Sequence, residues 1–113
     1  MYACLNIYPM SKGHALIMPK EHAEVLGDGS KEAAMRLMET LYKIAPAIMK
    51  ALGADGYNLG MNHGACAGQL VFHTHLHLMP RWDGVERTFE KMESSQEELA
   101  EVAEMIRKET NAL

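Results

Sequence analysis

Three histidines stand at alternate positions in the segment VFHTHLHLMPR, residues 71–81: His73, His75 and His77. The chain has six histidines, so half of them fall within this one segment. Because the intervening residues are mostly apolar, the pattern predicts a β-strand over residues 70–79, in which successive side chains point to opposite faces. The three imidazoles would then share one face and could act on one ligand. The opposite face would be core, and it would carry Phe72, Thr74, Leu76 and Leu78.

The spacing of these histidines decides between a metal site and a phosphate site. Neighbouring imidazoles on a strand start about 6.6 Å apart and the outer two about 13 Å apart, whereas zinc bonds are about 2 Å long. A third ligand would have to come from elsewhere, and Cys4 and Cys66 are isolated. An extended phosphate group uses the row better, because one imidazole can attack phosphorus while its neighbours donate to oxygens. We therefore expect no metal and no cofactor, although a metal-binding protein remains an alternative.

Length and charge limit the classes of protein to which the chain can belong. Its 113 residues predict a single domain, residues 1–113, with one core. The net charge of −4 gives no electrostatic footprint for a nucleic-acid partner. The opening residues MYACLNIYPMSKGH predict neither a signal peptide nor a membrane span. Two unpaired cysteines suggest a reducing compartment, so a cytoplasmic location is expected.

The rest of the sequence predicts an α+β fold with an antiparallel sheet, one long helix and a carboxy-terminal helix. Short strands are predicted over YACLNIY (2–8) and HALIMP (14–19), joined by the turn-forming residues PMSKG. A further strand, GYNLGMN (56–62), should pair with the histidine strand as a hairpin. The glycine-rich loop HGACAGQ (63–69) would connect the two.

Capping residues and apolar spacing predict the two helices. The long helix should begin at a cap on Asp28 or Ser30 and end at Gly53, with a kink at Pro46. The second helix should follow the SQEE capping box at Ser95. Apolar residues spaced at i, i+3 and i+4 mark the buried faces. They are Met38, Leu41, Ala45, Ile48, Met49 and Leu52 in the first helix, and Leu99, Val102, Ala103 and Ile106 in the second.

Several segments together resemble a known group of enzymes. HTHLHLM resembles the His-x-His-x-His-x-x signature of the histidine triad (HIT) superfamily of nucleotide hydrolases and transferases. LNIYPMSKGHALIMPKEH and GYNLGMNHGACAGQ resemble two further segments of the superfamily, and PRWDG resembles the ending of prokaryotic and dinucleoside-polyphosphate-hydrolase-like members. The resemblance covers nearly the whole chain. It implies a HIT-like fold, a homodimer and a small-molecule substrate of the purine nucleotide type.

The resemblance also implies a role for each matching residue. His75, the middle histidine, would be the nucleophile that takes the nucleotidyl group, with His73 and His77 flanking the phosphate. An imidazole nucleophile needs its proton on the nitrogen that faces away from phosphorus, held by an acceptor such as a backbone carbonyl. The remaining roles concern binding and support. Asn62 would contact phosphate, Gln69 would lie in the phosphate-side loop, Asn6 would hold the ribose hydroxyls and His14 would support the triad from behind.

The chain departs from the pattern of the superfamily in three places. Members normally carry a further segment before the strand that opens here, and it supplies part of the base pocket, so the chain is N-terminally short. Cys4 stands where a bulkier apolar residue commonly lines the base site. Leu70 follows Gln69 where many members carry Ser or Thr to help the leaving group. An aliphatic residue there also occurs in polyphosphate-hydrolase-like members, which weakens a phosphoramidase assignment.

These observations lead to one functional hypothesis and two alternatives. The hypothesis is a hydrolase or transferase that cleaves at the α-phosphorus of a nucleoside phosphate derivative through a nucleotidyl-histidine intermediate. The derivative would be a dinucleoside polyphosphate or a nucleoside phosphoramidate. A nucleotide-binding module without catalysis and a metal-binding protein that uses the histidine row are the alternatives.

Overall fold

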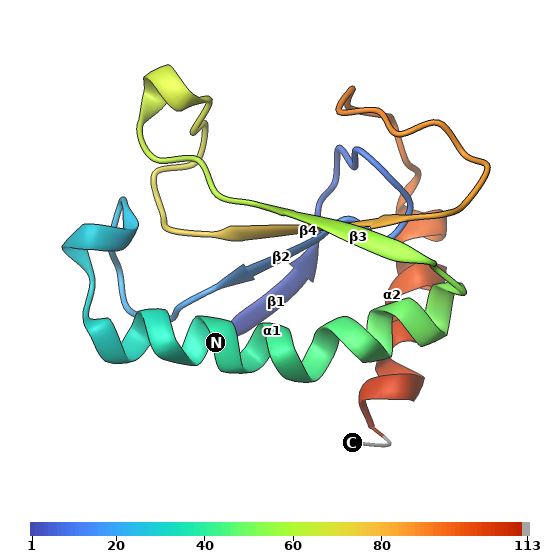
Figure 1. The fold of residues 1–113 in the computed structure, drawn as a ribbon, viewed down its shortest axis with the longest axis horizontal. Coiled ribbons are helices and arrows are strands. Elements are labelled where there is room, and N and C mark those ends of the chain that lie inside the picture. The colour runs from blue at the N-terminus through green and yellow to red at the C-terminus, as the bar shows by residue number, and fades with distance from the viewer. Residues whose placement is uncertain (112–113) are drawn as a thin grey trace.

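The computed structural model describes residues 1–111, which form a four-stranded antiparallel sheet and two helices (Figure 1). The strand order is β1-β2-β4-β3, so β1 and β3 are the edge strands. This architecture confirms the predicted α+β class. The strands are β1 (Tyr2–Leu5), β2 (Ala15–Met18), β3 (Gly56–Gly60) and β4 (Leu76–Arg81); the helices are α1 (Lys31–Leu52) and α2 (Gln96–Thr110), with short 3-10 turns η1 (Leu26–Asp28) and η2 (Ala65–Ala67).

Helix α1 begins and ends where its capping residues predict. The hydroxyl of Ser30 accepts a hydrogen bond from the backbone N–H of Ala33 at 3.1 Å and satisfies one free donor of the first turn. Gly53 closes the helix with φ of 59°, a left-handed conformation that glycine adopts without steric cost. The helix runs without a break past Pro46. Of the two predicted caps, Ser30 is the one used.

The core lies between α1 and one face of the sheet. Ile17 of β2 and Leu78 of β4 have no exposed surface, and they pack against Leu41, Ala45 and Ile48 of α1. These three helix positions confirm the predicted stripe. Its first member, however, is wrong: Met38 is 55% exposed, and Leu37 occupies the core instead.

The error follows from helix geometry. A stripe that runs Leu37, Leu41, Ala45 and Ile48 keeps to one side of the helix, whereas Met38 lies about 100° further around the axis from Leu37. Both residues satisfy an apolar pattern, and only the position of the sheet selects Leu37.

The histidine segment differs from its prediction. Strand β4 begins at Leu76, so residues 70–75 are not part of a strand. Its pairing with β3 runs from Gly56 opposite Arg81 to Gly60 opposite His77 and ends there. Of the three alternate histidines, only His77 therefore lies on a strand.

Residues 70–75 have a different set of partners from those of a strand. The backbone N–H of Thr74 donates to the carbonyl oxygen of Ala23 at 2.8 Å, and the Thr74 hydroxyl donates to the same oxygen at 3.1 Å. Thr74 is buried, as predicted, but Phe72 is 52% exposed and does not join the core. The segment is thus held by the chain that follows β2.

Helix α2 packs against α1 and touches β1 at the edge of the sheet (Figure 1). Its predicted capping box is present, because the Ser95 hydroxyl accepts from the N–H of Glu98 while the Glu98 carboxylate accepts from the N–H of Ser95. Val102 is buried, and Leu99, Ala103 and Ile106 are partly buried, which confirms the predicted face. In residues 1–111, no helix combines the length and the apolar character needed to cross a membrane.

Candidate active site

The His75 ring is held in one tautomer by its own neighbourhood. Its Nδ1 lies 2.7 Å from the carbonyl oxygen of His73, and the side chain is 9% exposed. A carbonyl oxygen can only accept, so Nδ1 of the neutral ring carries the proton and donates it. The other nitrogen, Nε2, is left with a lone pair. This is the arrangement that an imidazole nucleophile requires.

A second chain of hydrogen bonds orients His77. The backbone N–H of Met10 donates to Nδ1 of His14 at 3.0 Å, so the proton of the neutral His14 ring is on Nε2. His14 Nε2 lies 2.8 Å from Nδ1 of His77 and donates to it. The proton of the neutral His77 ring is therefore on Nε2. His14 is only 1% exposed, so the group that orients His77 is itself fixed by packing.

Electrostatics keeps both of these rings neutral. The pKa of His14 is lowered to about 4, chiefly by burial and further by the neighbouring basic groups His77, Arg81 and His75, which disfavour a second positive charge. Burial, followed by the charges of His75 and Lys91, also lowers the pKa of His77. At neutral pH both rings therefore hold one proton each, and the tautomers above are the relevant ones.

The three histidines predicted to share one face are not equivalent. The His75 and His77 rings are neighbours, with centroids 4.8 Å apart. His73 turns toward the end of β2, where its Nε2 lies 2.8 Å from the carbonyl oxygen of Pro19 and its ring lies 5.5 Å from that of His22. The hydrogen bond that His73 makes to His75 comes from its backbone. The predicted strand does not contain this difference, because a regular strand would direct all three histidine side chains to the same face.

Two polar residues shape the loop before the triad. Gln69 is buried; its side-chain oxygen accepts from the N–H of Gly64 at 2.8 Å, and its amide donates to the carbonyl oxygens of Val71, at 3.1 Å, and Glu24. Gln69 therefore ties the loop to its surroundings. Asn62 donates from Nδ2 to the carbonyl oxygen of Gly68 at 3.3 Å.

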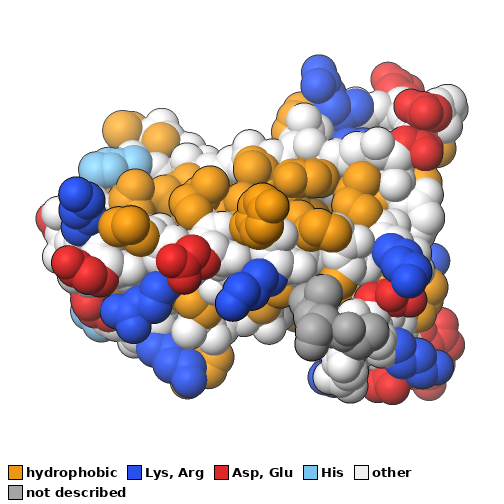
Figure 2. All heavy atoms as spheres, turned by 60° about the horizontal axis from the view of Figure 1, so that its bottom comes forward, with side chains coloured by type: hydrophobic (Ala, Val, Ile, Leu, Met, Phe, Trp, Pro, Cys, Tyr) orange, Lys and Arg blue, Asp and Glu red, His pale blue; other side chains and the backbone are white. Residues whose placement is uncertain are grey.

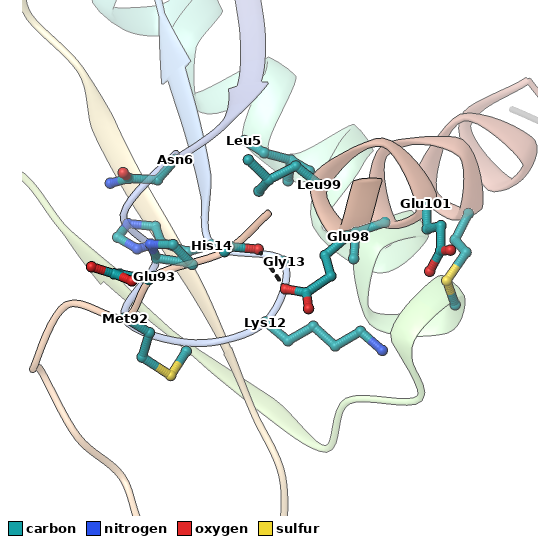
Figure 3. Close-up of a pocket in the computed structure, with 14 residues that line it drawn as sticks. Leu5, Asn6, Lys12, Gly13, His14, Met92, Glu93, Glu98, Leu99 and Glu101 are labelled. Atoms are coloured by element: carbon teal, nitrogen blue, oxygen red, sulfur yellow. Dashed lines mark hydrogen bonds between the residues drawn. The ribbon is translucent and has the colours of Figure 1, made fainter. Parts of the chain in front are cut away.

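Asn6 and His14 lie side by side at the other end of the site. The backbone N–H of Asn6 donates to the His14 carbonyl oxygen at 2.9 Å. The Asn6 side-chain oxygen accepts from the N–H of Tyr8 at 2.9 Å, which identifies Nδ2 as the atom left to donate to a ligand. Both residues line a cavity of about 420 Å³ (Figure 3).

Sequence reasoning missed the segment between β4 and α2. Arg81 donates from Nε to the side-chain oxygen of Asn58 at 2.9 Å and from Nη1 to the carbonyl oxygen of Thr88 at 2.8 Å. Met92 and Glu93 of the same segment line the cavity with Asn6 and His14. Residues 85–94 carry no recognisable motif, so no signal in the sequence pointed to them.

The arrangement also bears on the metal-binding interpretation. In the part of the chain that the structure describes, no three His, Cys, Asp or Glu side chains are grouped so that they could hold a metal ion. The three histidines instead direct ring nitrogens toward the carbonyl oxygens of Pro19 and His73 and toward His14.

Comparison with known proteins identifies the family of the chain. Residues 1–84 match the model of the HIT domain. The chain is 43% identical over 77 residues to the adenylylsulfatase HINT3 of Arabidopsis thaliana, an alignment that covers 68% of this chain and 39% of that protein. It is 35% identical over 85 residues to an AP-4-A phosphorylase of Mycobacterium tuberculosis, covering 74% and 44%. The chain thus spans less than half the length of these two relatives.

Solved structures show the same relationship. A HIT-like protein from Bartonella henselae, described as involved in cell-cycle regulation, superposes with a TM-score of 0.88 at 34% identity, covering 95% of this chain and 78% of that one. The family match covers most of the chain, includes all three alternate histidines and is accompanied by the same fold. The chain therefore belongs to the HIT domain family.

Proposed function

We propose that the protein is a nucleotide hydrolase or transferase that cleaves at the α-phosphorus of a nucleoside phosphate derivative. One observation carries the proposal: the His73 carbonyl holds the proton of His75 on Nδ1 and leaves the Nε2 lone pair beside His77. Support comes from the family and from relatives that are named as an adenylylsulfatase and an AP-4-A phosphorylase.

In the first step, Nε2 of His75 attacks phosphorus, a P–N bond forms, and the bond from phosphorus to the leaving group breaks. The ring becomes cationic, since Nδ1 keeps its proton, and the His73 carbonyl oxygen stabilises that charge. Nε2–H of His77 donates to a phosphoryl oxygen as negative charge develops there. In the second step water attacks phosphorus, the P–N bond breaks, His75 returns to its neutral form and a proton passes to solvent.

The tautomer of His77 bears on the leaving group. A neutral His77 with its proton on Nε2 can donate a hydrogen bond, but complete transfer of that proton would leave an anionic ring. Phosphate and polyphosphate groups depart as stable anions and need no proton, whereas an amine does. Leu70 stands where a hydroxyl residue could assist the leaving group, and its side chain carries no hydroxyl group. We therefore propose a dinucleoside polyphosphate, rather than a phosphoramidate, as the better substrate.

The proposal also assigns a contact with the substrate to Asn62 and Asn6 and a supporting role to His14. Asn62 contacts the phosphate from the loop before the triad, where Gln69 holds the backbone in place. Asn6 donates from Nδ2 to a ribose hydroxyl. His14 supports His77 and does not touch the substrate.

Trapping the intermediate tests the proposed function. Wild-type protein is mixed briefly with a dinucleoside polyphosphate and denatured at alkaline pH, because phosphorus–nitrogen bonds of histidine are lost in acid. Mass spectrometry should show one added nucleotidyl group on the peptide that contains His75. A His63→Ala variant, which removes an exposed histidine, serves as the matched control and should label equally. Label on any other residue would refute the mechanism.

Comparing substrates tests the leaving group. We expect kcat/KM for a dinucleoside polyphosphate to exceed that for a nucleoside phosphoramidate of the same base. The reverse order would mean that a proton does reach the leaving group, and it would overturn the argument from the His77 tautomer.

We also propose that the protein is a homodimer that buries an apolar band on α1. Figure 2 shows hydrophobic side chains gathered along this face, and Met35, Met38 and Tyr42 are all more than half exposed there. Edge strand β3 adds two exposed apolar residues, Tyr57 and Leu59. A band of this kind next to an open sheet edge favours a second copy of the same surface.

Light scattering tests the dimer. The wild type should have twice the mass of one chain at micromolar concentration, and Tyr42→Glu should reduce it to one chain, because Tyr42 is 85% exposed and a buried carboxylate there would lack a partner. Glu39→Gln, on the same helix, is the control. A wild type that stays monomeric would refute the proposal.

A further inference from the structure

The segment that connects β4 to α2, residues 82–95, lies over the face of the sheet that carries His77. His77 and Arg81 are an even number of positions apart on β4, so their side chains share a face, opposite to the face on which Leu78 packs against α1. Arg81 donates from Nη1 to the carbonyl oxygen of Thr88 at 2.8 Å, and this bond draws the connecting segment over that face. Figure 1 shows the segment on the side of the sheet opposite α1.

A single peptide group joins the far end of the connecting segment to the histidines. The backbone N–H of Met92 donates to the carbonyl oxygen of Pro9 at 2.8 Å. The N–H of that same peptide group donates to Nδ1 of His14 at 3.0 Å, and Nε2 of His14 donates to Nδ1 of His77 at 2.8 Å. The backbone of Lys91, which precedes Met92, is therefore held beside this pair of rings.

The side chain of Lys91 acts on His77. Burial is the largest cause of the lowered pKa of His77, and the neighbouring basic groups His75 and Lys91 lower it further. Such an effect falls off over roughly 10 Å, so the Lys91 ammonium lies on the His77 side of the connecting segment. The guanidinium of Arg87, in the same segment, instead lowers the pKa of Arg81.

Lys91 differs from the neighbouring cations in having no partner of its own. The Lys20 ammonium lies 5.2 Å from the centre of the Tyr2 ring, and Arg81 donates to the side-chain oxygen of Asn58 at 2.9 Å. Lys91 is exposed, and among residues 1–111 no carboxylate forms an ion pair with it. Its three N–H donors are therefore available to a ligand.

A phosphate group at the histidines needs a cation of this kind. The rings of His14 and His77 are neutral at neutral pH, and His75 is neutral until its Nε2 attacks phosphorus. The row of rings therefore offers neutral donors to a substrate that carries several negative charges. A hydrogen bond from an ammonium to a phosphate oxygen is roughly twice as strong as a bond between neutral groups.

We propose that Lys91 binds the phosphate oxygens of the nucleotide beside His77. This inference rests on the proposed nucleotide chemistry at His75. It adds a binding residue that lies beyond residue 84, where the family match ends.

The pKa of His77 tests the position of Lys91 without any substrate. Lys91→Gln should raise this pKa, because a positive neighbour that disfavours the charged ring is removed. Arg87→Gln, which makes the same change of charge in the same segment, should leave the His77 pKa at its wild-type value. NMR signals of the ring followed across pH measure it. An unchanged His77 pKa in Lys91→Gln would overturn the inference, whatever the activity of His75.

Activity tests the contact with phosphate. Lys91→Gln should lower kcat/KM for a dinucleoside polyphosphate by about tenfold, the value of one charge-assisted hydrogen bond. Lys91→Arg keeps the charge and should retain most of the activity, and Arg87→Gln is the matched control. Calorimetry with AMP locates the contact. Weaker AMP binding in Lys91→Gln would place it at the α-phosphate, whereas a loss confined to the dinucleoside polyphosphate would place it at the phosphates that follow.

Two outcomes separate this inference from the proposed function. Equal kcat/KM in Lys91→Gln and Arg87→Gln, together with a nucleotidyl label on His75 in the wild type, would overturn the role of Lys91 and leave the chemistry at His75 standing. A wild type that neither cleaves the dinucleoside polyphosphate nor carries the label would overturn both.

Discussion

The region up to residue 84 and the region from residue 85 to 111 are held in the fold in different ways. In the first, two rings of the candidate site are held by backbone atoms: the Met10 N–H orients His14, and the His73 carbonyl orients His75. In the second, one buried valine, a few partly buried apolar residues and isolated polar contacts such as Met92 to Pro9 attach α2 and the preceding segment. Backbone atoms move only if the fold moves, so the first region fixes the tautomers that the proposed chemistry needs. The second can vary its side chains while it still closes the cavity.

The largest expected contrast is in catalysis. His75→Ala should abolish turnover, because no other group can form the P–N bond, and stopped-flow or discontinuous assays should find no rate above background. His77→Ala should lower the rate by a factor of roughly 10² to 10⁴, the usual range for hydrogen-bonding or acid–base help. His73→Ala should keep more activity still, since the backbone carbonyl that orients His75 remains. Loss in His73→Ala equal to that in His75→Ala would show that the His73 side chain takes part directly.

The next contrast is in stability. Leu78→Ala should cost about 2 to 5 kcal/mol of unfolding free energy, because the side chain has no exposed surface and its removal leaves a cavity against α1. Val102→Ala should cost about 2 kcal/mol or less, the value of the apolar groups removed from a more open site. Urea titration measures both. A Val102→Ala variant that loses as much stability as Leu78→Ala would contradict the view that α2 is the more weakly held element.

The pH dependence of stability is a smaller effect that also belongs to the first region. Because the folded pKa of His14 is lowered from 6.5 to about 4, the unfolded chain binds the proton more readily, so stability is full above pH 6.5 and falls as the pH drops toward 4. The expected loss from His14 is about 2 kcal/mol at pH 5. His14→Gln should show less of this loss when urea midpoints at pH 7 and pH 5 are compared. The same dependence in both proteins would assign the effect to other groups.

The sequence by itself determined the classes of the elements, both ends of α1 and the start of α2, because these depend on neighbours along the chain, whereas the predicted strands differ from the observed ones in their bounds. Ser30 and Gly53 mark α1, and Ser95 with Glu98 marks α2, since a cap is satisfied within one turn. The alternate histidines and the two flanking segments were sufficient to identify the family.

Only the tertiary structure decided where the histidine side chains point. Alternation predicted one strand with three equal imidazoles, but the carbonyl oxygens of Ala23 and Pro19 draw Thr74 and His73 away from the sheet before β4 begins. These partners are more than fifty positions away in sequence, so no local pattern contains them. The same holds for the cavity, whose walls meet because Met92 bonds to Pro9 across most of the chain. The local periodicity of a sequence indicates the conformation of the backbone at those residues. The position of a carbonyl oxygen or a cavity wall that is distant in sequence depends on how the whole chain packs.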